Sequence, residues 1–125
     1  MIVVDTDILI WILRGREDIL DLFKQKIEKQ NKIFFITAIQ IAEICAGVRE
    51  AEKIVTERLI KSFNILKIDE KVGELAGKYL NRYLKSNNVT LSDAMIAAVT
   101  VLNDMKLWTL NKKHYPMLEE KVFEN

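Results

Sequence analysis

The stretch Ile2-Val3-Val4-Asp5-Thr6-Asp7-Ile8-Leu9 places two carboxylates directly after a run of apolar residues. The run Ile2 to Val4 has the pattern of a short strand that is buried on both faces. Asp5 stands where this strand should end, and Asp7 follows two positions later. A carboxylate beside a core is costly unless hydrogen bonds or a cation stabilise it. The stretch therefore predicts a buried strand with a functional site at its end.

Outward from this strand, apolar strands alternate with amphipathic helices. Thr37 and Gln40 have the spacing of a capping box, which predicts that a helix begins there. The alternation favours an α/β fold with a mainly parallel sheet of four to five strands. The expected strands are 2–4, 32–37, 64–69 and 107–110, with a possible edge strand at 122–123, and the expected helices are 8–13, 17–29, 37–47, 50–63, 70–85 and 93–103.

The bulk composition is that of a folded protein without an obvious partner. The 125 residues fit one domain, 1–125, and 19 basic against 18 acidic side chains leave a net charge of +1. Attraction to nucleic acid must then come from local patches. The one cysteine, Cys45, excludes a disulfide scaffold, and its apolar surroundings predict a buried side chain. No run has the length and apolar character of a membrane span or leader, so we expect a cytoplasmic protein.

Three acidic residues from distant parts of the chain are expected at one end of the sheet. Asp5 ends the first strand, Glu43 lies on a helix that follows the second, and Asp93 opens an apolar helix. Sites in parallel α/β folds form at the carboxyl ends of the strands. Glu43 shares a helix face with Ile39 and Ala46, which predicts that it points inward. Oxygen ligands without a His or Cys cluster favour Mg²⁺ or Mn²⁺.

Each acid also has a purely structural interpretation. Asp5 could simply end a strand, and Asp7 could cap the helical turn that begins at Ile8. Asp93 could be a helix N-terminal charge that the helix dipole favours. Glu43 is the hardest of the four to explain structurally, because the pattern places it on an apolar face.

Four blocks of the sequence together resemble the PIN domains, and most closely the VapC toxins of prokaryotic toxin–antitoxin pairs. The resemblance implies a three-layer α/β/α fold around a mainly parallel sheet. It also implies an Mg²⁺- or Mn²⁺-dependent ribonuclease that acts on tRNA or other structured RNA, forms a homodimer and is neutralised by an antitoxin. The blocks are IVVDTDILIWILRG (2–15), FFITAIQIAEICAGV (34–48), TLSDAMIAAVTVLND (90–104) and LWTLNKKHYP (107–116).

The resemblance also implies roles for individual residues. The catalytic and metal-binding acids are Asp5, Glu43 and Asp93, and the accessory residues are Thr6, Asp7, Thr109 and Asn111. The family often has Asp where Asn111 stands, so one or two metal ions stay possible. Many VapC relatives have Asn in place of Asp7, where a carboxylate would compensate in part for Asn111.

Further residues and two other functions complete the expectations. Arg14, Lys112 and Lys113 are candidates for contacts with RNA phosphates, and His114 is expected to be a loop residue near the site. One alternative is a non-catalytic PIN module that binds RNA or protein, which Asn111 keeps open. The other is a phosphatase of the haloacid dehalogenase type, because Asp5-Thr6-Asp7 resembles its D-x-D pair, although Leu9 departs from that motif.

Overall fold

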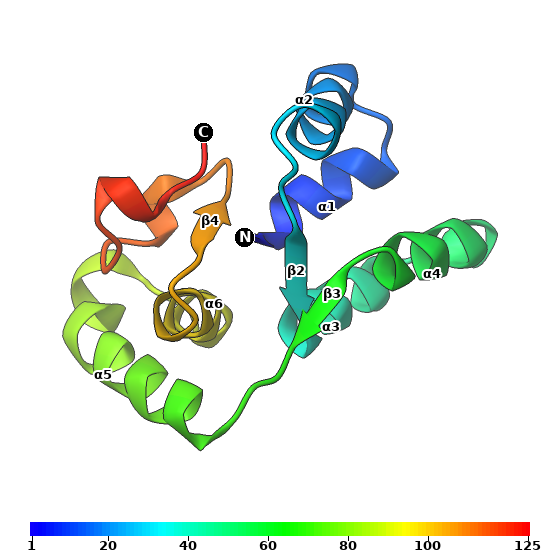
Figure 1. The fold of residues 1–125 in the computed structure, drawn as a ribbon. Helices are drawn as coiled ribbons and strands as arrows, with labels where there is room; N and C mark the ends of the chain where they lie inside the picture. Colours follow the sequence, from blue (N-terminus) through cyan, green and yellow to red (C-terminus); the bar gives the residue numbers. More distant parts are fainter.

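The protein is built around a four-stranded, all-parallel sheet (Figure 1). A computed structural model describes all 125 residues. The strand order is β3-β2-β1-β4, so the first strand is central and its carboxyl end lies between those of β2 and β4. The strands are β1 (Ile2–Val4), β2 (Phe34–Thr37), β3 (Asn64–Leu66) and β4 (Lys106–Trp108).

Helices cover both faces of the sheet. Figure 1 shows α1 to α4 on one side and α5 and α6 on the other. This arrangement confirms the three-layer α/β/α fold. The helices are α1 (Thr6–Leu13), α2 (Glu17–Glu28), α3 (Ala38–Gly47), α4 (Lys53–Lys61), α5 (Glu70–Asn87) and α6 (Leu91–Leu102), with 3₁₀ turns η1 (Glu50–Glu52), η2 (Lys112–His114) and η3 (Glu120–Val122).

The side chains of β1 divide between the two layers because neighbours on a strand point to opposite faces. Val3 packs with Ile96 of α6, whereas Ile2 and Val4 pack with Ile8 of α1 on the other face. All three β1 side chains are fully buried. The carboxyl end of β1 is thereby held between two helical layers.

Local capping signals fix where the helices near the site begin. Thr37 and Gln40 form the predicted capping box at the start of α3. Thr90 caps α6 and forms a second capping box with Asp93. Asp5 caps α1, which begins at Thr6 and therefore earlier than the expected Ile8. Asp5 thus ends the central strand and starts the first helix.

Several expected boundaries differ from the structure. The third strand ends at Leu66 rather than Asp69, and the helix expected over 50–63 is divided into η1 and α4. The possible edge strand at 122–123 was wrong, because Phe123 makes only one isolated parallel bridge to Leu107. Cys45 is exposed and not buried, since α3 buries Gln40 and Ile44 instead. No helix has both the length and the apolar character needed to cross a bilayer.

Candidate active site at the carboxyl edge of the sheet

Asp5 is a buried carboxylate held only by neutral hydrogen-bond donors. Its side chain is 8% exposed. Oδ1 accepts a hydrogen bond from Thr6 N at 2.8 Å. Oδ2 accepts one from Thr109 Oγ1 at 2.7 Å and one from Tyr115 Oη at 2.9 Å. No Lys or Arg forms an ion pair with Asp5, so its charge is met by hydrogen bonds alone.

The surroundings of Asp5 disfavour its charged form. Burial raises the pKa of Asp5 to about 6, and the negative charge of Asp7 acts in the same direction. The hydrogen bonds from Thr109, Tyr115 and Thr6 lower the pKa but do not offset the burial. A carboxylate in this position is stabilised by any cation that approaches it.

Thr6 connects Asp5 to Glu43. Its backbone N donates to Asp5, and its hydroxyl donates to Glu43 Oε1 at 2.8 Å. The expectation that Glu43 points into the core was wrong, because its side chain is exposed. The buried face of α3 runs through Gln40 and Ile44, and at about 100° per residue Glu43 falls at the edge of that face.

Asp93 lies at the first turn of α6, where its side chain completes the capping box. Asp93 N donates to Thr90 Oγ1 at 3.1 Å, and Asp93 Oδ2 accepts from Thr90 N at 3.4 Å. The structural interpretation of Asp93 as a helix-start residue is thus confirmed. Burial raises the pKa of the Tyr115 hydroxyl, and the charge and hydrogen bond of Asp5 raise this pKa further. The charge of Asp93 also raises the Tyr115 pKa, so Asp93 acts electrostatically on the site.

Asp7 binds the loop that follows β4. Its Oδ2 accepts hydrogen bonds from Leu110 N at 3.0 Å and Asn111 Nδ2 at 3.0 Å, and lies 3.3 Å from Thr109 Oγ1. Its Oδ1 accepts one from Ile8 N at 2.7 Å. Asp7 is not the N-cap of the first helix, because Asp5 occupies that position. The accessory residues Asp7, Thr109 and Asn111 are therefore in direct contact.

Tyr115 is the site residue that the sequence reasoning missed. Its side chain is 1% exposed and its hydroxyl reaches Asp5. A buried tyrosine hydroxyl usually has a polar partner, and the block 107–116 already belonged to the site. Its partner could not be inferred from the sequence, because Asp5 lies 110 positions away.

The basic candidates lie outside this cluster. Lys113 and His114 are exposed. Lys112 Nζ forms an ion pair with Glu120 Oε1 at 2.7 Å. The Arg14 guanidinium lies 5.6 Å from the centre of the Trp11 ring. None of them contacts an acid of the site.

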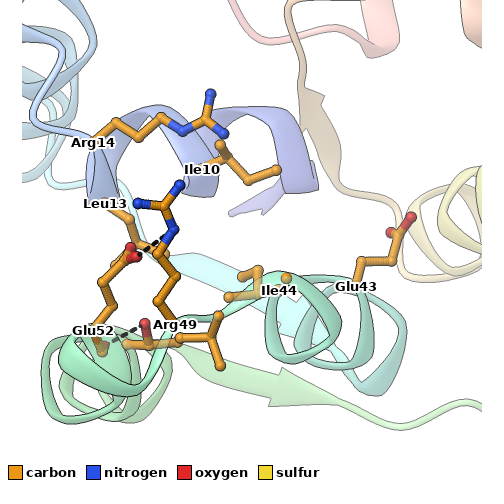
Figure 2. A pocket seen from close by; sticks show the side chains of 10 residues that line it. Ile10, Leu13, Arg14, Glu43, Ile44, Arg49 and Glu52 are labelled. Atoms are coloured by element: carbon orange, nitrogen blue, oxygen red, sulfur yellow. Dashed lines mark hydrogen bonds and ion pairs between the residues drawn. The ribbon is translucent and has the colours of Figure 1, made fainter.

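A cavity of about 400 Å³ opens beside Glu43, between α1, α3 and the segment that leads into α4. Figure 2 shows Arg14 and Arg49 at one end and Glu43 at the other, with the Glu43 carboxylate pointing away from the arginines. The Nε atom of Arg49 lies 3.8 Å from Oε1 of Glu52. The apolar part of the lining comes from Ile10, Leu13, Ile44 and Val48.

The side chains at the site are of the chemical type that a hard divalent cation prefers, because they carry carboxylate oxygens. No group of three or more His, Cys, Asp or Glu side chains is arranged to hold a metal ion, so the three predicted ligands are not gathered around one point. Mg²⁺ commonly binds through one or two carboxylates and keeps several waters. Asp5, Asp7, Glu43 and Asp93 supply carboxylates that no Lys or Arg neutralises.

Together, the fold and the site define a small parallel α/β domain with acidic residues at the carboxyl edge of its sheet. The family model of the PIN domain matches residues 2–117. The chain therefore belongs to the PIN-domain family, as the resemblance predicted. Membership of the PIN-domain family argues against the alternative of a phosphatase of the haloacid dehalogenase type.

The chain is similar to curated ribonucleases over nearly its whole length. It is 36% identical over 121 residues to ribonuclease VapC10 from Mycobacterium tuberculosis, covering 96% of this chain and 90% of the relative. It is 30% identical over 122 residues to ribonuclease VapC1 from Methanocaldococcus jannaschii, covering 95% of this chain and 82% of the relative. These relatives confirm the resemblance to VapC proteins.

Two solved structures share the fold. A toxin–antitoxin complex from Klebsiella pneumoniae has a TM-score of 0.76 and 26% identity, and the match covers 93% of this chain and 91% of that chain. VapBC2 from Rickettsia felis, bound to a DNA fragment from their promoter, has a TM-score of 0.80 and 18% identity, with 100% and 98% covered. The second match carries the fold alone.

Proposed function

We propose that residues 1–125 form a single PIN domain that acts as an Mg²⁺- or Mn²⁺-dependent endoribonuclease of the VapC type. The chain hydrolyses phosphodiester bonds of tRNA or other structured RNA and is neutralised by an antitoxin. The observation that carries the proposal is the chain of contacts from buried Asp5 through Thr6 to Glu43. It joins two carboxylates through one threonine at the carboxyl edge of the sheet.

Asp5, Glu43 and Asp93 are the residues that would hold the metal ion, directly or through water. A bound Mg²⁺ or Mn²⁺ stabilises negative charge on phosphate oxygens and lowers the pKa of a water molecule. Thr6 orients Glu43 through its hydroxyl, and Thr109 and Tyr115 hold the Asp5 carboxylate in a fixed orientation. No histidine is required as a base, and His114 is exposed.

The hydrogen bonds of Asp5 determine which of its oxygens remains available. A carboxylate has about four lone-pair positions, two on each oxygen. Oδ2 already accepts from Thr109 and Tyr115, whereas Oδ1 accepts only from Thr6 N. Asp5 therefore offers its open position through Oδ1.

The RNA is contacted by basic side chains at the border of the site. Arg14 and Lys113 are exposed, and Arg14 lines the cavity that reaches Glu43. Cations that contact phosphates strengthen RNA binding in a salt-dependent way. The ion pair with Glu120 makes Lys112 the weakest of the three basic candidates.

The antitoxin partner is supported by the type of complex that the neighbours form. A segment that fills the cavity between α1 and α3 also covers the exposed side of Glu43, because Glu43 lines that cavity. The apolar wall accommodates aliphatic side chains.

The homodimer, which the family resemblance implies, is tested by sedimentation of the purified chain.

The function is tested by incubating the purified chain with total tRNA, with EDTA or with added Mg²⁺ or Mn²⁺. We expect cleavage that needs the metal and is lost in Asp5→Asn, Glu43→Gln and Asp93→Asn. Asp21→Asn is the matched control, because Asp21 is exposed and distant from the site in sequence.

Two results would contradict the proposal. Cleavage at the wild-type rate by one of the three variants removes that residue from the mechanism. Absence of cleavage together with tight RNA binding favours the non-catalytic PIN module that Asn111 keeps open.

A further inference from the structure

The loop that follows β4 is bound to the first turn of α1 by the side chain of Asp7, in addition to the contacts of Thr109 and Tyr115 with Asp5. Asp7 Oδ2 accepts hydrogen bonds from Leu110 N and from Asn111 Nδ2, both at 3.0 Å. Asn111 N in turn donates to Thr109 Oγ1 at 3.1 Å. The position of Thr109, which holds Asp5, therefore depends on the contact between Asp7 and this loop.

The two carboxylates Asp5 and Asp7 meet at the Thr109 hydroxyl. Thr109 Oγ1 lies 2.7 Å from Asp5 Oδ2 and 3.3 Å from Asp7 Oδ2. A hydroxyl has one proton to donate, and the shorter distance assigns that proton to Asp5. Asp7 thus adds a second carboxylate directly beside Asp5.

The amide of Asn111 is committed to Asp7 as a donor. An ionised carboxylate only accepts hydrogen bonds, so the amide must present its NH₂ group to Asp7. Asn111 is half-buried, and its Nδ2 contact with Asp7 spans 104 positions of sequence. Its nitrogen is therefore engaged inside the protein.

We propose that Asp7 and Asn111 act as one carboxylate–amide pair, in which Asp7 supplies the negative charge at this corner of the site and Asn111 positions it instead of binding metal. This inference rests on the proposed function, since it concerns the same site. Both are positioning residues. They set the charge and the loop geometry around Asp5.

The pair can be tested by exchanging its two residues. One carboxylate and one amide face each other across one hydrogen bond, so Asp7→Asn combined with Asn111→Asp retains one charge and one donor. Each single change destroys the pair in a different way. Asp7→Asn removes the charge, and Asn111→Asp sets two carboxylates against each other.

The experiment measures Mn²⁺ binding by calorimetry and the melting temperature in EDTA for both single variants and the double variant. We expect Asp7→Asn to weaken Mn²⁺ binding about tenfold, as loss of a group that supports metal ligands does. We expect Asn111→Asp to lower the melting temperature by a few degrees. The double variant should recover part of both losses, because an amide at position 7 has one acceptor oxygen for the two backbone N–H groups of Ile8 and Leu110. Asp21→Asn and Asn81→Asp, both on exposed helix positions, are the matched controls.

Clear results overturn the proposal. These are Mn²⁺ binding at the wild-type level in Asp7→Asn, losses in the double variant that equal the sum of the single losses, or a double variant that does not fold. If Asn111→Asp alone fails to fold while the double variant folds, the pair is supported. A wild-type chain that binds no Mn²⁺ refutes the role of the Asp7 charge in the site.

These measurements need no RNA, so they separate this inference from the proposed function. Coupled losses in a chain that cuts no RNA support the pair and refute the ribonuclease. RNA cleavage by wild type, with unchanged Mn²⁺ binding in Asp7→Asn, supports the ribonuclease and refutes the pair.

Discussion

Thr6 donates a hydrogen bond from Oγ1 to Glu43 Oε1 at 2.8 Å and so joins the first turn of α1 to α3. The same residue donates its backbone N–H to Asp5. Two acids that are 38 positions apart in the sequence are thereby oriented by one threonine. The geometry of the candidate site therefore depends on a side chain that carries no charge.

Replacement of this threonine tests the connection. Thr6→Val keeps the shape and the backbone N–H but frees Glu43, and we expect RNA cleavage to fall about 10- to 100-fold. The free energy of unfolding should change by about 1 kcal/mol, because exposed Glu43 is readily solvated. Thr6→Ser, which retains the hydroxyl, is the control and should stay near the wild-type rate. Equal rates for the valine and serine variants would refute the role of the hydroxyl.

The pH dependence of stability reports on Asp5. Its pKa rises from 3.8 to about 6 on folding, so the folded chain binds this proton more tightly than the unfolded chain does. The contribution is fully present below pH 3.8 and is lost as pH rises through 6. It amounts to on the order of 3 kcal/mol, since one pH unit corresponds to about 1.4 kcal/mol.

Urea unfolding in EDTA between pH 4 and pH 7.5 measures this contribution, with Asp5→Asn as the reference that lacks the group. We expect the stability of wild type relative to Asp5→Asn to decrease across this range. A difference that does not vary with pH would show that Asp5 titrates at its ordinary pKa.

Tyr115 should affect the site more than the core. Tyr115→Phe keeps the buried ring but leaves Asp5 Oδ2 with Thr109 as its one remaining donor. We expect a loss of about 1.5–3 kcal/mol at pH 8, where Asp5 is charged, and a smaller loss at pH 5. Tyr79→Phe is the control, because Tyr79 packs against the hydrophobic cluster between α5 and α6 and forms no hydrogen bond with Asp5. Equal losses at both pH values would indicate that the hydroxyl does not sense the charge of Asp5.

A buried ion pair joins α2 to the C-terminal segment without contacting the acids of the site. Lys26 is 1% exposed and its Nζ lies 2.8 Å from Glu124 Oε2. Lys26→Met leaves Glu124 buried with Lys32 at 3.8 Å as its remaining cation, and we expect a loss of about 3–5 kcal/mol. The control is Lys53→Met, whose ion pair with Glu50 is exposed and should contribute less than about 1 kcal/mol. Similar losses in the two variants, measured by urea unfolding, would contradict this prediction.

The candidate site could be predicted from the sequence only in part. Asp5 was found because a polar residue at the end of a buried strand breaks a simple local pattern. Glu43 was expected at the site from its place on an apolar helix face and from the family resemblance, but its expected inward direction was wrong. The neighbouring Gln40 and Ile44 occupy the buried face of α3, and periodicity alone does not distinguish the centre of such a face from its edge.

By itself, the sequence determined the approximate positions of the four strands and the capping box at Thr37, because these depend on neighbours within a few positions. Only the tertiary structure decided which donors surround each carboxylate. The contacts of Asp5 with Tyr115 and of Asp7 with Asn111 span 110 and 104 positions. They exist because parallel strands β1 and β4 lie side by side, and hydrogen bonds of about 3 Å depend on a proximity that no local pattern encodes.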